Sequence, residues 1–267
     1  MTVFQALVLG LVQGLAEFLP ISSSAHLALT PWALGWTAPG LAFDVALHVG
    51  TLAAVLAYFR LEWLRLIQAS REIVTTRRVT TVEQRRVVFL VLATIPGAIG
   101  GLLLDDYAET TFRAPGLIAS TLIAMGIILW VVDRYAPRAV PLERLRWQHA
   151  LLIGLAQVMA LVPGVSRSGA TMTAGRAVTL DRQSAATFSF LLSMPITAAA
   201  AIFKVPEAVQ QSGFGAPLIV GVLASGISGW LAMAVLLRYV SRRSYGVFAL
   251  YRLLFGALVL ATYYARQ

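Results

Sequence analysis

A carboxylate, an amide, three hydroxyls and an imidazole lie close together near the start of an otherwise apolar chain. Glu17 follows Gln13 by one helical turn, so both side chains share one face of a helix. A carboxylate at membrane depth costs about 2.5–3.5 kcal/mol on insertion scales, which makes it a candidate functional group. Proline removes a backbone donor and breaks the helix at Pro20. The polar side chains after this break are Ser22, Ser23, Ser24 and His26.

A second break, Pro163-Gly-Val-Ser-Arg-Ser, carries the complementary chemistry. Its polar residues are Ser166, Arg167, Ser168 and Thr171. The helix after each break should begin at the serines, which turns its free N–H groups and its positive dipole end into the break. The Arg167 guanidinium can hold phosphate oxygens in a bidentate fork. Two helix N-termini that meet around an arginine predict an anion site, and phosphate is the anion it suits.

A divalent cation is expected beside such a phosphate site. Mg²⁺ and Ca²⁺ take oxygen ligands and can be shared between one or two side chains and substrate phosphates. Glu17 and Gln13 are the candidate protein ligands.

Structural interpretations of the same residues stay open. A serine after a break is commonly a helix N-cap. Glu17 and Arg167 could form an ion pair without chemistry, and His48 and His149 could be structural. The functional interpretation is favoured by a coincidence, because the charged residues at membrane depth fall at the two breaks together with hydroxyls and a histidine.

The composition places these residues in a membrane protein. Of 267 residues, 58% are hydrophobic and 12% are charged, and the mean hydropathy is +0.78. Soluble chains carry about 25% charged residues, so a water-soluble domain is excluded. The chain has no cysteine, which rules out a disulfide framework and any thiolate chemistry.

Six segments are apolar enough to span a bilayer, which needs about 20 residues with 17 as the lower limit. The sixth carries Arg252 about two turns from its start. The predicted spans are 43–59, 87–104, 115–132, 185–203, 216–237 and 246–264.

The arginines between the spans predict the topology. Connections 60–86, 134–147 and 238–243 hold seven, four and three arginines. The alternate connections, 105–114 and 204–215, hold one basic residue each. The positive-inside rule places the arginine-rich connections in the cytoplasm and both termini outside. The net charge of +9 is therefore explained by topology, and no nucleic-acid partner is expected.

Residues 3–35 and 148–178 each contain two short apolar halves around a break. In lipid, a broken backbone survives only where protein or a watery cavity shields it. We therefore predict two re-entrant helical hairpins, each of which returns to the side from which it entered.

The chain also contains an internal repeat. A shift of 144 residues aligns Gln13 with Gln157, Ser22 with Ser166, and Ser24 with Ser168. Each half, about 1–133 and 148–267, is then a hairpin followed by three spans, so the second half must enter from the opposite face. The predicted fold is an all-α polytopic membrane protein with an inverted-topology repeat, formed by one integral membrane domain over 1–267. In such repeats the site is expected near the midplane, where broken helices meet.

Two signatures resemble those of the undecaprenyl-diphosphatase (bacitracin-resistance protein) family. They are Gln13-Gly-Leu-Ala-Glu17-Phe-Leu-Pro-Ile-Ser-Ser-Ser-Ala-His26 and Pro163-Gly-Val-Ser-Arg-Ser-Gly-Ala-Thr171. Phe43-Asp-Val-Ala-Leu-His-Val-Gly-Thr51 is also typical of the family, and the resemblance covers the whole chain. Position 13 is Gln where many members have Glu, which leaves Glu17 as the only carboxylate of the motif and makes compensation by Asp44 an open question.

The resemblance implies hydrolysis of undecaprenyl diphosphate to undecaprenyl phosphate and phosphate in a bacterial plasma (inner) membrane. It also implies a divalent cation at the acidic motif. The expected partners are the prenyl diphosphate lipid and bilayer lipids, and the assembly could be a homodimer. The residues expected to bind phosphate are Arg167, Ser166, Ser168, Thr171 and Ser24. Glu17 and Gln13 are expected to bind the cation, and His26 to transfer a proton or attack. A hydroxyl of Ser22, Ser23 or Ser166 binds phosphate or acts as nucleophile, and the sequence does not choose among them.

A transporter or flippase of an anionic polyprenyl lipid is the alternative function. Inverted repeats with broken helices at the midplane are common in transporters, and an anionic-lipid site would serve transport equally well. Release of phosphate by the protein in detergent discriminates the two functions, since transport needs two compartments and hydrolysis does not.

Overall fold

A computed structural model describes residues 1–109, 114–212 and 215–266 and is helical almost throughout. The prediction of an all-α membrane protein is confirmed. Parts of the two arginine-poor connections, 110–113 and 213–214, lie outside the described residues. The α-helices are α1 (Val3–Phe18), α2 (Ser23–Leu34), α3 (Leu41–Tyr58), α4 (Arg60–Thr76), α5 (Val82–Glu109), α6 (Pro115–Tyr135), α7 (Trp147–Val158), α8 (Arg167–Ala177), α9 (Arg182–Ser212), α10 (Ala216–Val240) and α11 (Gly246–Ala265).

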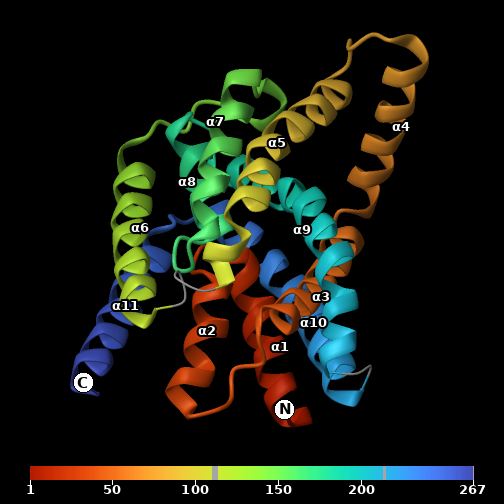
Figure 1. Ribbon diagram of the computed structural model, residues 1–267. Helices are drawn as coiled ribbons and strands as arrows, with labels where there is room; N and C mark the ends of the chain where they lie inside the picture. The colour runs from red at the N-terminus through yellow and green to blue at the C-terminus, as the bar shows by residue number, and fades with distance from the viewer. Residues whose placement is uncertain (110–113, 213–214, 267) are drawn as a thin grey trace.

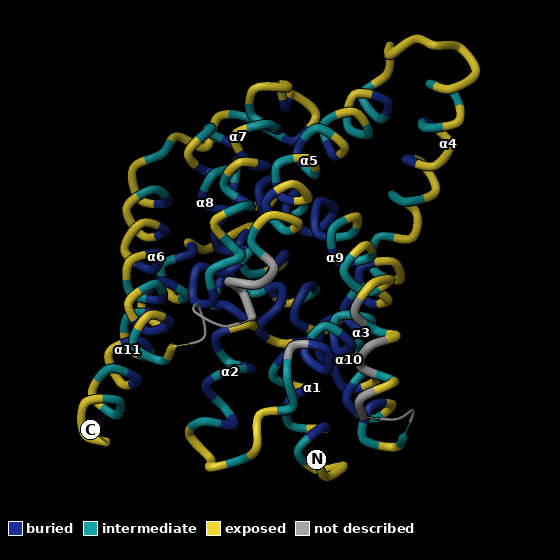
Figure 2. The backbone as a smooth tube through the Cα atoms, in the orientation of Figure 1, coloured by how far each residue is buried: buried dark blue, intermediate teal, exposed yellow. Residues whose placement is uncertain are grey.

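Five of the described helices are long and apolar enough to cross a membrane, and they coincide with five predicted spans. They lie in α5, α6, α9, α10 and α11. The remaining predicted span is α3, which turns by 82° into α4 at Phe59. The arginine-rich segment after this bend is therefore largely helical, and it extends with the start of α5 away from the bundle (Figures 1 and 2).

Both predicted hairpins are present, and they enter the bundle from opposite ends (Figure 1). Helices α1 and α2 rise from the end that carries the N- and C-termini, whereas α7 and α8 descend from the other end. A short 3-10 turn, Met159–Leu161, precedes the second break. The two breaks meet in the middle, where Figure 2 shows buried backbone. This arrangement agrees with an inverted repeat.

Small residues allow the first hairpin to pack closely against the spans. A Cβ atom added to Gly14 of α1 would lie 2.3 Å from the Ser225 carbonyl oxygen of α10. One added to Gly50 of α3 would lie 2.1 Å from the Val222 carbonyl oxygen on the same helix. Close backbone approach through small residues is the usual basis of helix packing in membranes, and it fixes α1 and α3 on α10.

A buried charge cluster holds the helix ends at the arginine-rich end of the bundle. The Asp133 carboxylate accepts hydrogen bonds from Arg182 Nε at 2.7 Å, Arg176 Nε at 3.1 Å and the Tyr245 backbone N–H at 3.0 Å. Arg176 is fully buried and also donates to the Pro137 carbonyl at 2.9 Å. The cluster joins α6, α8, α9 and the start of α11, so these two arginines stabilise the fold.

Candidate active site

The two breaks are built alike. Ser22 and Ser166 cap α2 and α8, and each accepts a hydrogen bond from the backbone N–H three residues on. Both serines have a positive φ, 78° and 73°, which L-residues rarely adopt. In each hairpin the capping hydroxyl lies 3.2 Å from the hydroxyl two residues later, on Ser24 or Ser168. The predicted helix starts at the serines are thus confirmed for both hairpins.

The two breaks also bind each other. The Gly164 backbone N–H donates to Ser22 Oγ at 3.1 Å, and Ser168 Oγ donates to the Leu19 carbonyl at 3.0 Å. Because these bonds link the two tips directly, the N-termini of α2 and α8 open onto the same space, as the repeat predicts.

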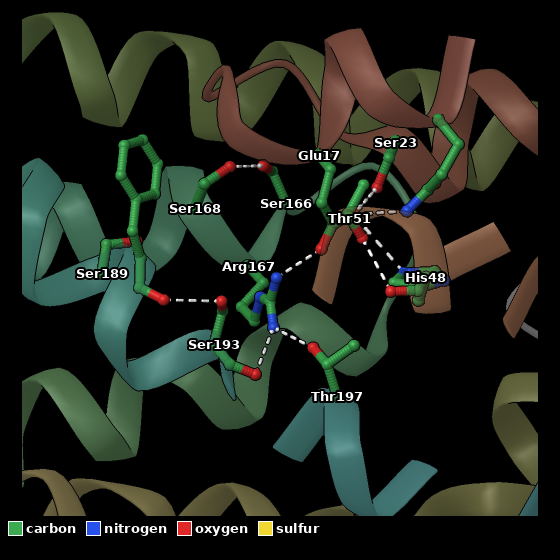
Figure 3. A network of polar contacts seen from close by, with 12 residues as sticks. Glu17, Ser23, His48, Thr51, Ser166, Arg167, Ser168, Ser189, Ser193 and Thr197 are labelled. Atoms are coloured by element: carbon green, nitrogen blue, oxygen red, sulfur yellow. Dashed lines mark hydrogen bonds and ion pairs between the residues drawn. The ribbon is translucent and has the colours of Figure 1, made fainter. Parts of the chain in front are cut away.

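Glu17 is the centre of the polar network between the breaks (Figure 3). Its carboxylate is 6% exposed and forms an ion pair with the Arg167 guanidinium across 150 residues of sequence. Ser23 Oγ donates to Glu17 Oε2 at 2.6 Å, and Gln13 Nε2 donates to the same oxygen at 3.0 Å. His48 Nε2 lies 3.4 Å from that oxygen. One carboxylate therefore collects donors from both hairpins and from α3.

Arg167 is held from its other side by α9. Its second terminal nitrogen donates to Thr197 Oγ1 at 2.7 Å and to the Ser193 carbonyl at 3.1 Å. Figure 3 shows the guanidinium between Glu17 on one side and Ser193 and Thr197 on the other. The ion pair with Glu17 and these two acceptors hold the partly buried arginine in one orientation.

A cavity of about 190 Å³ lies beside this pair. Its polar lining includes Glu17, Ser23, Ser24, His48, Gln157, Ser166 and Arg167. Its apolar lining includes Leu161, Ile196 and Ala200. The cavity therefore combines one carboxylate, one guanidinium and the hydroxyls at two helix N-termini, which suits a phosphorylated ligand with an apolar part.

Other predicted site residues lie around this cavity without lining it. Thr171 Oγ1 donates to the Arg167 carbonyl at 2.7 Å and lies 2.6 Å from Ser189 Oγ, so it faces α9. His26 Nδ1 lies 2.7 Å from the Ser22 carbonyl oxygen and its Nε2 2.7 Å from Tyr251 Oη. Its ring stacks on Phe255 at 4.6 Å between centroids. The hydroxyls of Ser22 and Ser168 bridge the breaks, as described above.

Sequence reasoning left the contact of His48 with Glu17 undetected. His48 belongs to the motif Phe43-Asp-Val-Ala-Leu-His-Val-Gly-Thr51, and the sequence leaves a structural role for it open. His48 Nδ1 lies 2.8 Å from the Asp44 carbonyl oxygen one turn earlier, which leaves Nε2 facing the carboxylate. A histidine one turn after an acidic residue on an apolar span was the available signal.

The cation prediction can be compared with the donors present. No group of three or more His, Cys, Asp or Glu side chains suited to a metal ion occurs among the described residues. Gln13 Oε1 is buried without a hydrogen-bond partner and belongs to the residue that donates to Glu17. This donor set fits a cation that takes most of its ligands from phosphate oxygens.

Comparison with known proteins gives a consistent family. The family model described as bacitracin resistance protein BacA matches residues 6–258. A protein of Gemmatimonas aurantiaca named undecaprenyl-diphosphatase is 62% identical over 266 residues, covering 100% of both chains. Proteins of the same name from Pelotomaculum thermopropionicum and Desulforudis audaxviator are 50% and 47% identical. These two alignments cover 100% and 97% of this chain and 99% and 97% of the relatives.

Proposed function

The chain belongs to the bacitracin resistance protein BacA family, and on that premise we propose that it hydrolyses undecaprenyl diphosphate to undecaprenyl phosphate and inorganic phosphate. The reaction would return the lipid carrier to peptidoglycan synthesis and would confer resistance to bacitracin. The observation that carries the proposal is the Glu17–Arg167 pair, which lies in a cavity between the N-termini of two opposed hairpins.

The diphosphate would bind at the polar wall of the cavity. Arg167 offers a planar fork of donors to the phosphate oxygens, and the first turns of α2 and α8 offer free N–H groups. Leu161, Ile196 and Ala200 form an apolar wall, against which the first isoprene units would lie. Binding of the phosphates by preorganised donors would stabilise the charge that develops during phosphoryl transfer.

Ser23 is the hydroxyl best placed to attack the terminal phosphorus. Its Oγ already donates to Glu17 Oε2 at 2.6 Å, which is a nucleophile–base pair within hydrogen-bond reach. The Ser22 and Ser166 hydroxyls are engaged as helix caps. In the first step Ser23 Oγ bonds to phosphorus, Glu17 takes the hydroxyl proton, and undecaprenyl phosphate leaves. Glu17 passes this proton to the departing undecaprenyl phosphate. In the second step water attacks the phosphoserine, Glu17 takes the water proton and gives it to Ser23 Oγ as the P–Oγ bond breaks, and inorganic phosphate is released.

A divalent cation, Mg²⁺ or Ca²⁺, would be held by Glu17 and Gln13. When bound with the substrate it would neutralise phosphate charge. The buried, unpartnered Gln13 Oε1 supports this assignment. His26 would fix the first break through the Ser22 carbonyl, where it can also serve proton transfer at the edge of the site.

The test is phosphate release from a prenyl diphosphate by the purified protein in detergent. We expect the wild type to release phosphate without a membrane. Ser23→Ala should lose activity on the order of 10³-fold because the nucleophile is absent. Ser120→Ala is the control, since that hydroxyl bonds the Gly116 carbonyl within α6 and does not line the cavity. Transport of prenyl diphosphate between compartments without phosphate release would favour the flippase alternative.

The proposed location is the bacterial inner membrane, with both termini outside and the arginine-rich end in the cytoplasm. The chain has no cysteine, so single cysteines can be introduced without background. We expect impermeant reagents to label position 37 in intact cells and to leave position 78 unlabelled. Labelling of position 78 from outside the cell would contradict this topology and support the reverse one. Disulfide cross-linking of the same variants tests whether two copies form a homodimer.

A further inference from the structure

A second arginine contacts both breaks from a span that carries no other charge. Arg252 of α11 is 1% exposed, and among the described residues it donates only to backbone carbonyl oxygens. Its terminal nitrogens bond Pro20 of the first break at 3.0 Å and Gly164 and Val165 of the second at 2.6 and 3.0 Å. Its Nε bonds the Leu122 carbonyl of α6 at 3.2 Å. One guanidinium thus joins α6, α11 and both hairpin tips.

Arg252 differs from the other deeply buried arginine, Arg176. The Arg176 side chain is paired with the Asp133 carboxylate. Within the described part of the chain, Arg252 has no ion pair, and carbonyl dipoles alone solvate its charge. Since Arg167 is already balanced by Glu17, the Arg252 charge gives the region of the breaks a net positive charge, which would favour an anion there.

The hydrogen bonds of Arg252 also fix the direction of the break backbone. A trans peptide is planar with its C=O and N–H on opposite sides. The Val165 carbonyl is held by Arg252, so the N–H of Ser166 is directed away from the guanidinium. The strained φ values of Ser22 and Ser166 persist only if the surroundings over-determine them. Arg252 supplies such a constraint at both breaks.

Two glycines make room for this side chain. A Cβ atom added to Gly169, in the first turn of α8, would lie 2.8 Å from Arg252 Nη1. One added to Gly126 of α6 would lie 3.1 Å from Arg252 Cβ. Gly169 directly follows Ser166-Arg167-Ser168, so the glycine of this motif is explained by the position of Arg252.

We propose that Arg252 is a positioning residue of the diphosphate site: it clamps the two breaks so that their N–H groups face the phosphates, and its charge favours the anion. This inference rests on the proposed phosphatase function for its kinetic readout. It assigns no contact between Arg252 and the substrate.

The decisive variant is Arg252→Lys, which keeps the charge but cannot reach four carbonyls with one planar fork. We expect its kcat for phosphate release from farnesyl diphosphate to fall on the order of 10²-fold, the scale seen when a preorganised donor is lost. Arg176→Lys is the matched control, since it also shortens a fully buried arginine that bonds backbone carbonyls, but at the arginine-rich end of the bundle and not at the breaks. The control should lower the melting temperature while its kcat stays within about threefold of wild type.

Gly169→Ala provides a second variant that removes no donor or charge. The added methyl should displace Arg252 and lower kcat by a similar factor. The added methyl would also lie 3.0 Å from Ser166 Cβ, next to the Val165 carbonyl that Arg252 holds. Because both changes act on this one group of contacts, the double variant Arg252→Lys with Gly169→Ala should lose less than the product of the two single losses. Near-wild-type kcat for Arg252→Lys, equal kcat losses for Arg252→Lys and Arg176→Lys, or multiplied losses in the double variant would each overturn the proposal.

A binding measurement separates this inference from the proposed function. Thermal shift with inorganic pyrophosphate reports the anion site without turnover. We expect Arg252→Lys to weaken pyrophosphate binding at least tenfold relative to wild type and Arg176→Lys to leave it unchanged. If the wild type binds pyrophosphate but releases no phosphate from the prenyl substrate, the phosphatase proposal fails while the binding comparison still decides the role of Arg252.

Discussion

The two hairpins have the same backbone arrangement at their breaks, but their side chains carry opposite charges. Both have a capping serine with positive φ and a second hydroxyl 3.2 Å away. Yet Glu17 of the first hairpin aligns with Leu161 of the second, and Ser23 aligns with Arg167. The first hairpin therefore supplies acid and hydroxyl, and the second supplies the cationic fork.

This difference in side chains explains why a fold built from two equivalent halves has one site at the breaks. Two symmetric copies would place like charges against each other at the midplane, which is unfavourable in a low-dielectric interior. With opposite charges on equivalent tips, each hairpin neutralises the other and the donors converge on one cavity. The spans after the hairpins align at a shift of 145 residues, which pairs His48 with Ser193. They follow the same division, since His48 of α3 contacts Glu17 whereas the backbone carbonyl of Ser193 in α9 accepts from Arg167.

Of the changes that test this division between the hairpins, removal of the Glu17 carboxylate should cause the largest loss of phosphate release. Glu17→Gln keeps the shape but removes the base and the partner of Arg167, so phosphate release should fall on the order of 10³-fold or more at any Mg²⁺ or Ca²⁺ concentration. The matched control is Glu62→Gln, which removes a carboxylate paired with Arg86 outside this cavity and should leave phosphate release close to wild type.

Phosphate release in detergent over a cation titration measures both variants. Full activity of Glu17→Gln in the presence of a chelator would show that Glu17 is neither the base nor a cation ligand.

Replacement of the Arg167 guanidinium should cause the second-largest loss of activity. Arg167→Lys keeps a positive charge beside Glu17, so we expect normal folding and a loss of kcat/KM on the order of 10²-fold. If the pair were only structural, a single neutral variant would leave a buried unpaired charge and cost about 3–5 kcal/mol of stability. The neutral double variant Glu17→Gln with Arg167→Gln would then recover.

Melting temperature and phosphate release are read on the same purified variants. Near-wild-type turnover of Arg167→Lys, or recovered activity of the double variant, would show that the Glu17–Arg167 pair has only a structural role.

The His48 contact should contribute less. His48→Leu removes the neighbour of Glu17 from α3, and we expect kcat/KM to fall about 10-fold, the scale of one hydrogen bond to a charged group. His48→Gln retains a donor and should stay within about threefold of wild type. Ser193→Ala in the aligned position should have little effect, because Arg167 uses the Ser193 backbone carbonyl. Equal losses for Leu and Gln at position 48 would contradict this role.

The sequence predicts the fold far better than it predicts which side chains contact the two breaks. Apolar length, loop arginines and the two prolines are local signals, and they locate the spans and both hairpins. The repeat then brings the breaks that carry Glu17 and Arg167 together, with their ion pair as one of the alternatives. The contacts of His26, His48 and Arg252 depend on which face of a helix meets the breaks, and spacing within one helix does not determine that. Arg252 is the clearest case, since its acceptors are backbone carbonyls, which no residue type identifies.

The smallest expected effect concerns Gln13, whose side chain donates to Glu17 and leaves its own Oε1 unpartnered. Gln13→Glu removes that donor and places two carboxylates one helical turn apart. Without a cation the pair should repel and lower the melting temperature, and with Mg²⁺ or Ca²⁺ it should bind the ion more tightly, since anionic oxygens are its preferred ligands.

Cation-dependent melting and phosphate release test this expectation, with a chelator as the reference state. We expect maximal activity close to wild type and a cation midpoint about tenfold lower, which corresponds to about 1.4 kcal/mol. Gln157→Glu, the aligned change in the second hairpin, adds its carboxylate without an acidic residue one turn later and should leave the cation midpoint unchanged. If Gln13→Glu and Gln157→Glu shift that midpoint equally, the cation is bound by both hairpins, and the division of chemistry between them does not extend to the metal.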